Sequence, residues 1–306
     1  MIENSPIAFS YPGYVATVGF FDGVHAGHRF LIEELKTIAI EQDLKSLVIT
    51  FAVHPRKVLN SDFQPQLLTT LAEKLYQLES TGIDNCIVLD FTLIMAKLSA
   101  YDFLKTILKE KYNVKTLLVG HDHRFGHNRA EGFPEYKKHG DSLGIDVIQA
   151  SRFITEKDQN ISSSKIRFAL QNGDIELANR LLTYQYSFRG KVIDGFKNGR
   201  KIGFPTANIQ PEDADKLIPA NGVYAVKVRW NNQIYKGMMN IGFRPTLENG
   251  QNISIEVHII DFDQNIYNQT LEIIFILKIR DEQKFKGIDE LIEQLRKDKK
   301  IVLEMY

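Results

Sequence analysis

The chain has 306 residues, which is enough for two ordinary domains, and its 43% hydrophobic and 25% charged residues indicate a globular protein without long disordered tracts. Basic and acidic residues both number 38, so the formal net charge is zero and the composition does not favour nucleic acid or an anionic membrane as a partner. Residues 1–11 lack the basic n-region of a signal peptide, no apolar run reaches the roughly 18 residues of a membrane span, and the single cysteine, Cys86, forms no internal disulfide, so we expect a soluble cytoplasmic protein.

The first predicted strand, residues 14–20, runs into a glycine-bearing turn, and apolar residues then recur at helical spacing. This order places a helix N-terminus over the carboxyl end of a strand, where free N–H groups and the helix dipole favour an anion. His25 and His28 lie at this point, and Gly23 and Gly27 let the backbone come close to a ligand. The turn is therefore predicted to bind phosphate, and the simpler alternative is a hydrogen-bonded histidine pair in a tight turn.

Further apolar runs alternate with helical patterns through the first half of the chain. Strands are predicted at residues 46–51, 86–89, 116–119 and 145–148, and helices at residues 71–78, 100–112 and 131–143. Such alternation is typical of βαβ units, so we expect an α/β domain built on a parallel sheet of Rossmann-like type.

Two further stretches reach the carboxyl edge of this sheet. Residues 50–55 end the second strand, and Pro55 holds His54 extended, so that its side chain can point at the crevice. Residues 120–126 follow the fourth strand. Both stretches are expected to meet the phosphate-binding turn, because the carboxyl ends of parallel strands lie at one edge.

A third stretch, residues 161–167, precedes a helix that its serines can cap. Lys165 and Arg167 could neutralise a triphosphate there. Seven of the eight histidines lie in the first 139 residues, a clustering that also occurs in zinc proteins. No H-E-x-x-H pattern accompanies them, so the sequence favours a phosphate site over a zinc site.

After residue 183 the pattern changes to short strands of alternating character. They are predicted at residues 187–194, 222–230, 234–241, 253–260 and 270–279, followed by one amphipathic helix beginning near residue 288. We expect an all-β domain, an antiparallel sheet closed as a barrel, with a closing helix. The domains are predicted to span residues 1–183 and 184–306.

A basic glycine loop with Gly195, Lys201 and Gly203 opens the second domain. Such a loop can cover ATP phosphates, although many are simple hairpin turns. Thr206 and Asn208 follow, two residues apart on an extended segment, and therefore point the same way. Their hydroxyl and amide oxygens suit Mg²⁺, and the alternative is a polar pair on an exposed strand face.

Glu256 lies between apolar neighbours in a predicted barrel strand. A carboxylate there is either a solvated outward residue or a base that faces a pocket of the barrel. The sequence pattern alone leaves both open.

Four stretches of the first half resemble the N-terminal half of bacterial FAD synthetases, the bifunctional riboflavin kinase/FMN adenylyltransferases. The patterns G-x-F-D-G-x-H-x-G-H, T-F-x-x-H-P, V-G-x-D-x-x-F-G and I-S-S-x-x-I-R fall at residues 19–28, 50–55, 119–126 and 161–167. This resemblance implies that an FMN phosphate oxygen attacks the α-phosphorus of ATP and pyrophosphate leaves, with Mg²⁺ sharing the charge. It implies catalytic roles for His25 and His28, and flavin contacts for His54 and Pro55. The ATP-binding residues that it implies are Gly19, Phe20, Asp22, Gly23, Gly27, Asp122, Ser163, Ser164 and Arg167.

The second half resembles the riboflavin kinase domain, most distinctively in the F-P-T-A-N stretch at residues 204–208. The resemblance implies that Thr206 and Asn208 hold magnesium, and that Glu256 takes the proton of the flavin 5′-hydroxyl as it attacks the γ-phosphate. Arg280 is placed near the flavin. ATP contacts are implied for Gly195, Lys201, Gly203 and Pro205. The resemblance covers essentially the whole chain.

Two rival functions fit the sequence less well. If the chain were a lone nucleotidyltransferase acting on a nicotinate or pantetheine nucleotide, the glycine loop and the F-P-T-A-N stretch of the second domain would have no function. A barrel that binds RNA would carry a basic face with spaced aromatics, whereas this chain is charge-balanced. We therefore expect small-molecule substrates (riboflavin, FMN, FAD and ATP) and no nucleic acid or membrane partner, and the sequence leaves weak or transient self-association open.

Overall fold

The computed structural model describes residues 2–3, 12–60, 62–121, 124–127, 131–153, 161–195, 198–244 and 252–305. The chain forms two compact units, residues 1–163 and 164–306. Two helices that the sequence-based boundary assigns to the first domain, α7 (Ser163–Gln171) and α8 (Ile175–Leu182), thus belong almost entirely to the second unit. The reason is the apolar face of α8, which packs against a barrel strand.

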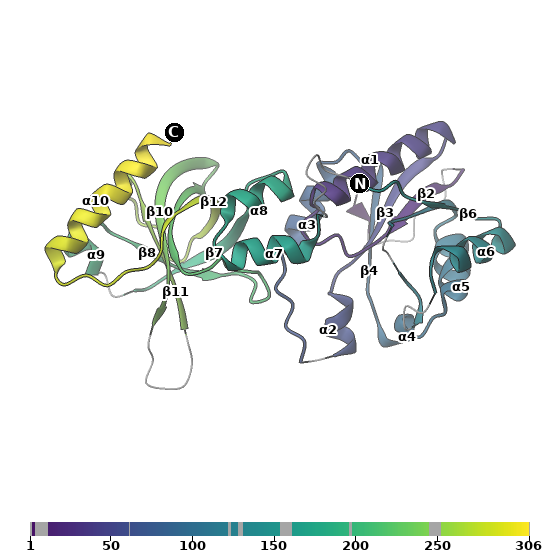
Figure 1. The fold of residues 1–306 in the computed structure, drawn as a ribbon, viewed down its shortest axis with the longest axis horizontal. Helices are drawn as coiled ribbons and strands as arrows, with labels where there is room; N and C mark the ends of the chain where they lie inside the picture. Colours follow the sequence, from purple (N-terminus) through teal and green to yellow (C-terminus); the bar gives the residue numbers. More distant parts are fainter. Residues whose placement is uncertain are drawn as a thin grey trace. The chain divides into compact units, whose positions relative to one another are not determined.

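The first unit is built on a six-stranded sheet in the order β1-β4-β3-β2-β5-β6, and every neighbouring pair is parallel (Figure 1). Its strands are β1 (Ile2–Glu3), β2 (Tyr14–Val18), β3 (Lys45–Phe51), β4 (Asn85–Leu89), β5 (Val114–Val119) and β6 (Asp146–Gln149). The expected parallel α/β sheet is confirmed.

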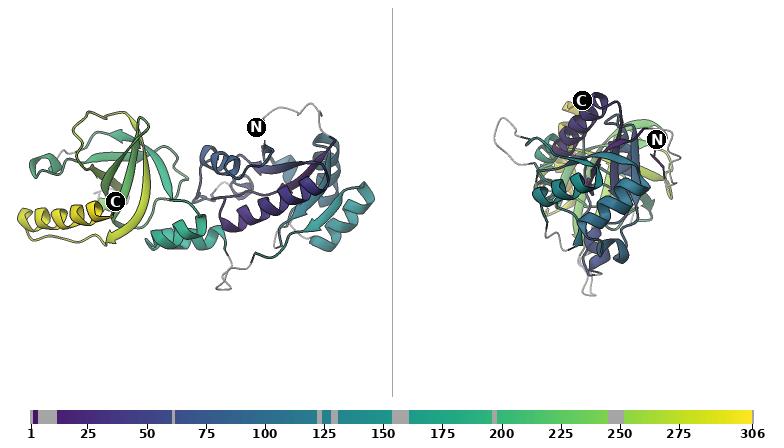
Figure 2. Two further views of the ribbon diagram at one scale, coloured as in Figure 1. Left: turned by 90° about the horizontal axis from the view of Figure 1, so that it is seen from above. Right: turned by 90° about the vertical axis from the view of Figure 1, so that its right-hand side faces the viewer.

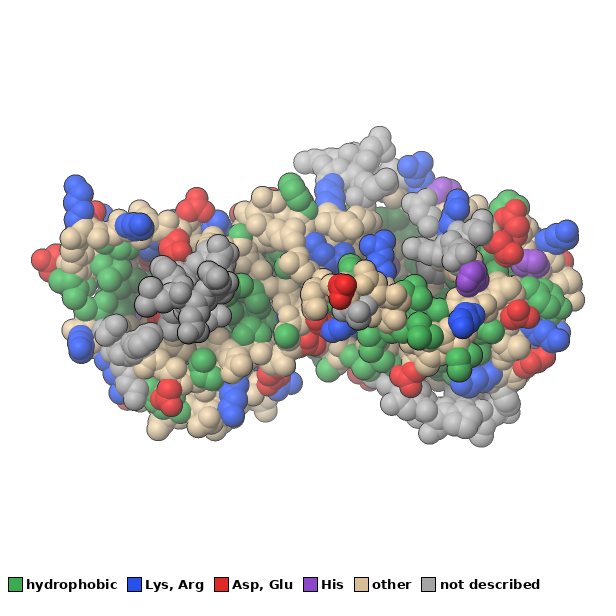
Figure 3. Space-filling view, turned by 90° about the horizontal axis from the view of Figure 1, so that it is seen from below, with side chains coloured by type: hydrophobic (Ala, Val, Ile, Leu, Met, Phe, Trp, Pro, Cys, Tyr) green, Lys and Arg blue, Asp and Glu red, His purple; other side chains and the backbone are tan. Residues whose placement is uncertain are grey.

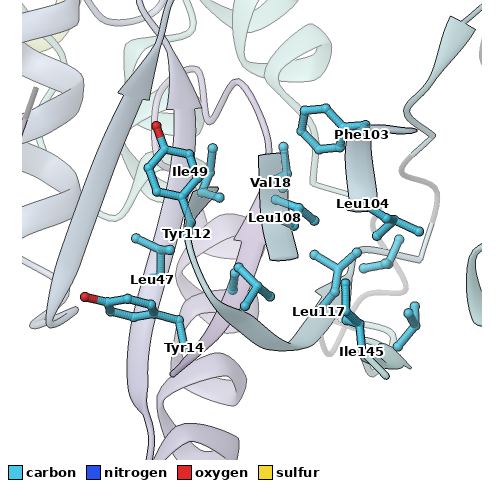
Figure 4. Close-up of a cluster of buried hydrophobic side chains, with 14 of the residues drawn as sticks. Tyr14, Val18, Leu47, Ile49, Phe103, Leu104, Leu108, Tyr112, Leu117 and Ile145 are labelled. Carbon is cyan, nitrogen blue, oxygen red and sulfur yellow. The ribbon is translucent and has the colours of Figure 1, made fainter. Parts of the chain in front are cut away.

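Helices cover both faces of this sheet. They are α1 (Ala26–Glu41), α2 (Pro55–Leu59), α3 (Leu71–Glu79), α4 (Leu93–Ala96), α5 (Ala100–Asp102), the π-helix η1 (Phe103–Lys111) and α6 (Phe133–Leu143). Because side chains alternate along a strand, Val15 packs in a cluster with α1 and α3, whereas Tyr14 packs in one with η1 and α6. Figure 4 shows side chains of the second cluster, to which Leu47 of β3 and Leu108 of η1 both belong.

Local geometry explains two departures from the predicted elements. The first strand ends at Val18 rather than at residue 20, because the chain turns sharply and Phe21 adopts a φ of 54°. The helix predicted over residues 100–112 forms, but it widens from α5 into the π-helix η1.

The second unit is a closed antiparallel barrel in the order β10-β11-β8-β7-β12-β9, as expected (Figures 1 and 2). Its strands are β7 (Ser187–Ile193), β8 (Ala207–Pro211), β9 (Gly222–Trp230), β10 (Gln233–Arg244), β11 (Asn252–Ile259) and β12 (Thr270–Arg280). A short helix, α9 (Asn198–Lys201), lies in the glycine loop, and the closing helix, α10 (Ile288–Glu304), packs against the barrel. Within the described ranges, no helix is both long enough and apolar enough to cross a membrane.

Candidate functional sites

The strand order of the first unit fixes where a ligand can bind. From β2 the chain proceeds through β3 and β4 to one side, and later through β5 and β6 to the other. The loops that follow β2 and β5 therefore diverge at a topological switch point, where open α/β sheets bind their ligands. The predicted phosphate-binding turn, residues 19–25, and the loop of residues 120–127 both start there.

The phosphate-binding turn has an unusual backbone. Phe21 and Val24 have φ angles of 54° and 36°, and Gly23 has a φ of 81°. A positive φ strains a β-branched residue such as Val24, so the surrounding structure must hold it. The turn delivers His25 to the N-cap of α1, where its Nδ1 accepts a hydrogen bond from the N–H of His28 at 3.4 Å. The two imidazoles stack, with ring centroids 3.7 Å apart and an interplanar angle of 14°.

A neighbouring segment holds the turn in place. The buried carboxylate of Asp22 accepts hydrogen bonds from the N–H groups of Leu68 and Thr69, both at 3.0 Å. The N–H of Gly23 donates to Oγ1 of Thr69 at 3.0 Å, and the hydroxyl of Ser163 donates to the carbonyl of Asp22 at 3.0 Å. The Asp22 side chain is thus engaged with the protein backbone, in a positioning role that the sequence did not reveal.

His54 and Phe20 form an aromatic cluster beside the turn. His54 caps α2 by accepting from the N–H of Arg56 at 3.2 Å, and Pro55 is the first residue of that helix. The rings of Phe20 and His54 meet edge to face at 4.7 Å, and Phe63 lies 5.3 Å from His54. Aromatic edges and faces of this kind suit a flat ring system.

The loop after β5 is only partly described. Asp122, which the sequence assigned to the nucleotide, lies outside the described residues. The end of the loop is anchored by Phe125, whose ring stacks on that of Tyr136 with centroids 4.1 Å apart. Gly126 then turns the chain with a φ of 88°. In Figure 3, the visible histidine side chains lie on the N-terminal unit beside hydrophobic and basic side chains. Among the residues with described positions, no three His, Cys, Asp or Glu side chains gather as a metal site would need.

Two other predicted ligands of the triphosphate, Ser164 and Arg167, lie on α7 in the second unit. Their neighbour Ser163 reaches the phosphate-binding turn through its bond to Asp22. Gly19 ends the β2–β3 pairing by donating to the carbonyl of Ile49 at 3.0 Å.

The barrel brings its predicted catalytic residues together. Glu256 on β11 lies in register with Asn208 on β8 and with Asn240 on β10. The hydroxyl of Thr206 donates to Oε2 of Glu256 at 3.2 Å, and that of Ser254 donates to Oε1 at 3.1 Å. Hydroxyl, amide and carboxylate oxygens thus converge at one place on the barrel, and Glu256 is partly buried within this group.

The glycine loop packs closely on this group. A Cβ on Gly195 would lie 2.0 Å from Nδ2 of Asn208, so a side chain there would displace the amide. Buried His258, which sequence reasoning missed, donates from Nδ1 to the carbonyl of Pro205 at 2.8 Å and thereby fixes the residue before Thr206. Burial lowers the pKa of His258, which favours the neutral ring. Gly203 turns the chain with a φ of 81°, and exposed Lys201 ends α9.

Arg280, expected near the flavin, is bonded to a buried carboxylate. Its Nε and Nη2 donate to the carboxylate of Asp298 at 3.1 and 2.9 Å, and its Nη1 donates to the carbonyl of Asp281 at 3.1 Å. Asp298 is fully buried on α10 and also accepts from Nε2 of Gln294 at 2.8 Å. The guanidinium therefore ties α10 to the end of β12.

Comparisons with known proteins cover both units. The family model for FAD synthetase matches residues 10–165, and that for riboflavin kinase matches residues 182–306. The bifunctional riboflavin kinase/FMN adenylyltransferase of Bacillus subtilis is 40% identical over 95% of this chain and 92% of its own length. The protein of that name from Escherichia coli K12 is 36% identical over 96% of this chain and 93% of its own length. A crystal structure from Streptococcus pneumoniae, described as a macrolide-efflux protein, superposes with a TM-score of 0.87 at 31% identity, over 99% of this chain and 98% of its own.

Proposed function

The chain belongs to the family of bifunctional riboflavin kinases/FMN adenylyltransferases, and from this premise we propose how its residues divide the two reactions. The enzyme phosphorylates riboflavin to FMN with ATP and then transfers an adenylyl group from a second ATP to FMN, which gives FAD. The FAD synthetase match covers the parallel-sheet unit, and the riboflavin kinase match covers the barrel.

For adenylyl transfer, we assign the ATP phosphates to the N-terminus of α1. The stacked pair of His25 and His28 at the switch point is the observation that carries this assignment. Since Nδ1 of His25 accepts from the N–H of His28, a neutral His25 carries its proton on Nε2 and can donate it to a phosphate oxygen. An FMN phosphate oxygen attacks the α-phosphorus, pyrophosphate leaves, and the imidazoles stabilise the charge that develops.

The neighbouring residues are assigned by their places around the turn. Glycines 19, 23 and 27 let the backbone approach the nucleotide, Phe20 contacts ATP, and His54 and Pro55 contact the flavin. Asp22 positions the turn from beneath. Asp122, Ser164 and Arg167 keep their proposed contacts with ATP on the strength of the sequence patterns.

For the kinase step, we assign the general base to Glu256, which takes the proton of the riboflavin 5′-hydroxyl while that oxygen attacks the γ-phosphorus and ADP leaves. Thr206 and Asn208 would hold Mg²⁺, because their oxygens converge with the carboxylate and the Thr206 hydroxyl keeps its lone pairs while it donates to Glu256. Bound magnesium would neutralise part of the phosphate charge. The loop residues Gly195, Lys201, Gly203 and Pro205 surround the ATP in this proposal.

A reciprocal experiment tests the division of labour. His28→Ala should lower FAD formation from FMN by roughly 10²–10³-fold, the cost of losing one donor to the transition state, while riboflavin phosphorylation continues. Glu256→Gln should lower FMN formation by about 10²–10⁴-fold and leave the adenylylation of supplied FMN intact. Chromatography of FMN and FAD after incubation with ATP and Mg²⁺ gives both rates. Loss of both activities in either folded variant contradicts the two-site assignment.

Three sequence-based expectations complete the proposal. We place the enzyme in the cytoplasm, where its one buried thiol, Cys86, would stay reduced. The balanced charge supports small molecules rather than nucleic acid as its partners. Any self-association would be weak or transient.

A further inference from the structure

Lys74 on α3 is a buried cation directly beside the adenylyltransferase site. Only 2% of the Lys74 residue is exposed to solvent. Its Nζ donates to the carbonyls of Phe20 and Phe51 at 3.1 and 2.8 Å and lies 4.0 Å from the centroid of the Phe20 ring. Burying an ammonium is costly unless its hydrogen bonds are satisfied, so such a residue at a functional site calls for an explanation.

The two carbonyls mark the place where two strands separate. Strands β2 and β3 pair in register as far as Val18 and Ile49, and Gly19 adds one more bond to that ladder. Beyond it the carbonyl of Phe20 accepts instead from Nζ of Lys74 and from the hydroxyl of Thr50 at 3.1 Å. The ammonium thus replaces the sheet ladder where the chain leaves it to form the phosphate-binding turn.

Lys74 also completes a support that begins six residues earlier. The N–H groups of Leu68 and Thr69 hold the carboxylate of Asp22, and Oγ1 of Thr69 holds the N–H of Gly23. Residues 68–74 therefore contact the turn at three places: the carbonyl of residue 20, the side chain of residue 22 and the amide of residue 23. A turn with a positive φ at Val24 needs support of this kind.

We propose that Lys74 is a positioning residue for adenylyl transfer: by bridging the carbonyls of Phe20 and Phe51 it fixes the start of the turn that presents His25 and His28. The proposal rests on the assignment of FAD formation to this unit. It also gives the Phe20 ring a fixed place against His54, because the cation lies over one aromatic face while the histidine meets the ring edge to face.

The test compares Lys74→Met with Lys36→Met in the full-length chain. Methionine keeps much of the length and volume but removes the charge and the donors. Lys36 is a matched control, because its Nζ also donates to a backbone carbonyl of this unit, that of Thr81 at 2.8 Å, but from a place ten residues along α1 from the turn. Initial rates of FAD formation against ATP concentration give kcat and KM, riboflavin phosphorylation serves as an internal control, and thermal unfolding reports integrity.

We expect Lys74→Met to lower kcat for FAD formation by roughly 10–100-fold, the effect of losing charge-assisted hydrogen bonds that hold a catalytic turn. KM for ATP should change much less, riboflavin phosphorylation should be unchanged, and the unfolding temperature should not fall, since an apolar side chain replaces a buried charge. Lys36→Met should retain normal FAD formation. Lys74→Gln, which keeps a neutral amide donor group, should lie between the wild type and Lys74→Met.

Normal kcat in folded Lys74→Met would overturn the proposal, as would an equal loss in Lys36→Met. A loss that only accompanies a lowered unfolding temperature in both Lys74 variants would also overturn it, because the lysine would then serve stability alone. Failure of the wild type to form FAD from FMN would instead refute the assigned function, so the two failures are distinguishable.

Discussion

The buried ion pair between Arg280 and Asp298 makes a prediction about the second unit that separates stability from catalysis. The change is Asp298→Leu, which leaves the guanidinium without its carboxylate. The Asp298 side chain is 0% exposed and that of Arg280 is 18% exposed. Removing one partner of a buried pair costs about 3–5 kcal/mol, and we expect the lower end because Arg280 retains some access to water. For a unit of this size about 3 kcal/mol corresponds to a fall of roughly 10 °C in Tm.

Trp230 provides a selective assay. It is the only tryptophan in the chain and lies on β9, so intrinsic tryptophan fluorescence reports unfolding of the barrel unit alone. The matched control is Glu272→Gln, which breaks the more exposed pair between Arg229 and Glu272 at 2.7 Å. That pair should contribute less than about 1 kcal/mol.

A double variant, Arg280→Met with Asp298→Leu, decides what Arg280 does. If the pair only ties α10 to β12, the double variant should recover most of the lost stability and still phosphorylate riboflavin, because an apolar pair can replace a buried ion pair. If Arg280 contacts the flavin as the sequence suggested, the double variant should be stable but inactive. A Tm for Asp298→Leu within about 2 °C of the wild type would refute the reasoning about the pair.

Two further predictions concern pH and domain limits. Burial lowers the pKa of Lys74 from 10.5 to about 8, so between these values the unfolded chain holds a proton that the folded chain has lost, and stability relative to Lys74→Met should rise by up to about 3 kcal/mol as pH rises through that window. Denaturant midpoints of both proteins at pH 7 and pH 9.5 measure this difference, and a constant difference would contradict the burial argument. The segment 164–306 should fold and phosphorylate riboflavin, whereas 184–306 should melt several degrees lower because it loses the buried Ile175 and Leu182 of α8. Equal melting of the two segments would show that α8 adds nothing to the barrel.

Periodic patterns and local motifs account for the parts of the fold that the sequence predicted. Apolar runs bounded by turn residues predicted β2, and two-residue alternation predicted the antiparallel barrel, because both signals are local. The spacing of His25 and His28 likewise implied a shared helix N-terminus, and the stacked rings agree with it.

Residues whose partners are distant in sequence were not predictable in this way. Lys74 reads as an ordinary position of an amphipathic helix until the carbonyls of two strand ends are seen beside its ammonium. His258 and Asp298 are hidden for the same reason, because their partners lie 53 and 18 residues away. The predicted domain limit falls after α8 whereas the compact units divide at residue 164, because helical periodicity shows that a face is apolar but not which core buries it.

The strand order of the barrel bears on how the chain is synthesised. The first barrel strand, β7, pairs with the last, β12, which also pairs with β9 and so fills the space between them. A nascent chain that has not yet released residues 270–280 from the ribosome therefore carries two open strand edges, and only the final segment can close the ring. The parallel sheet is complete once β6 has emerged, so the adenylyltransferase unit can fold during translation, whereas the kinase unit must wait until the chain is almost finished.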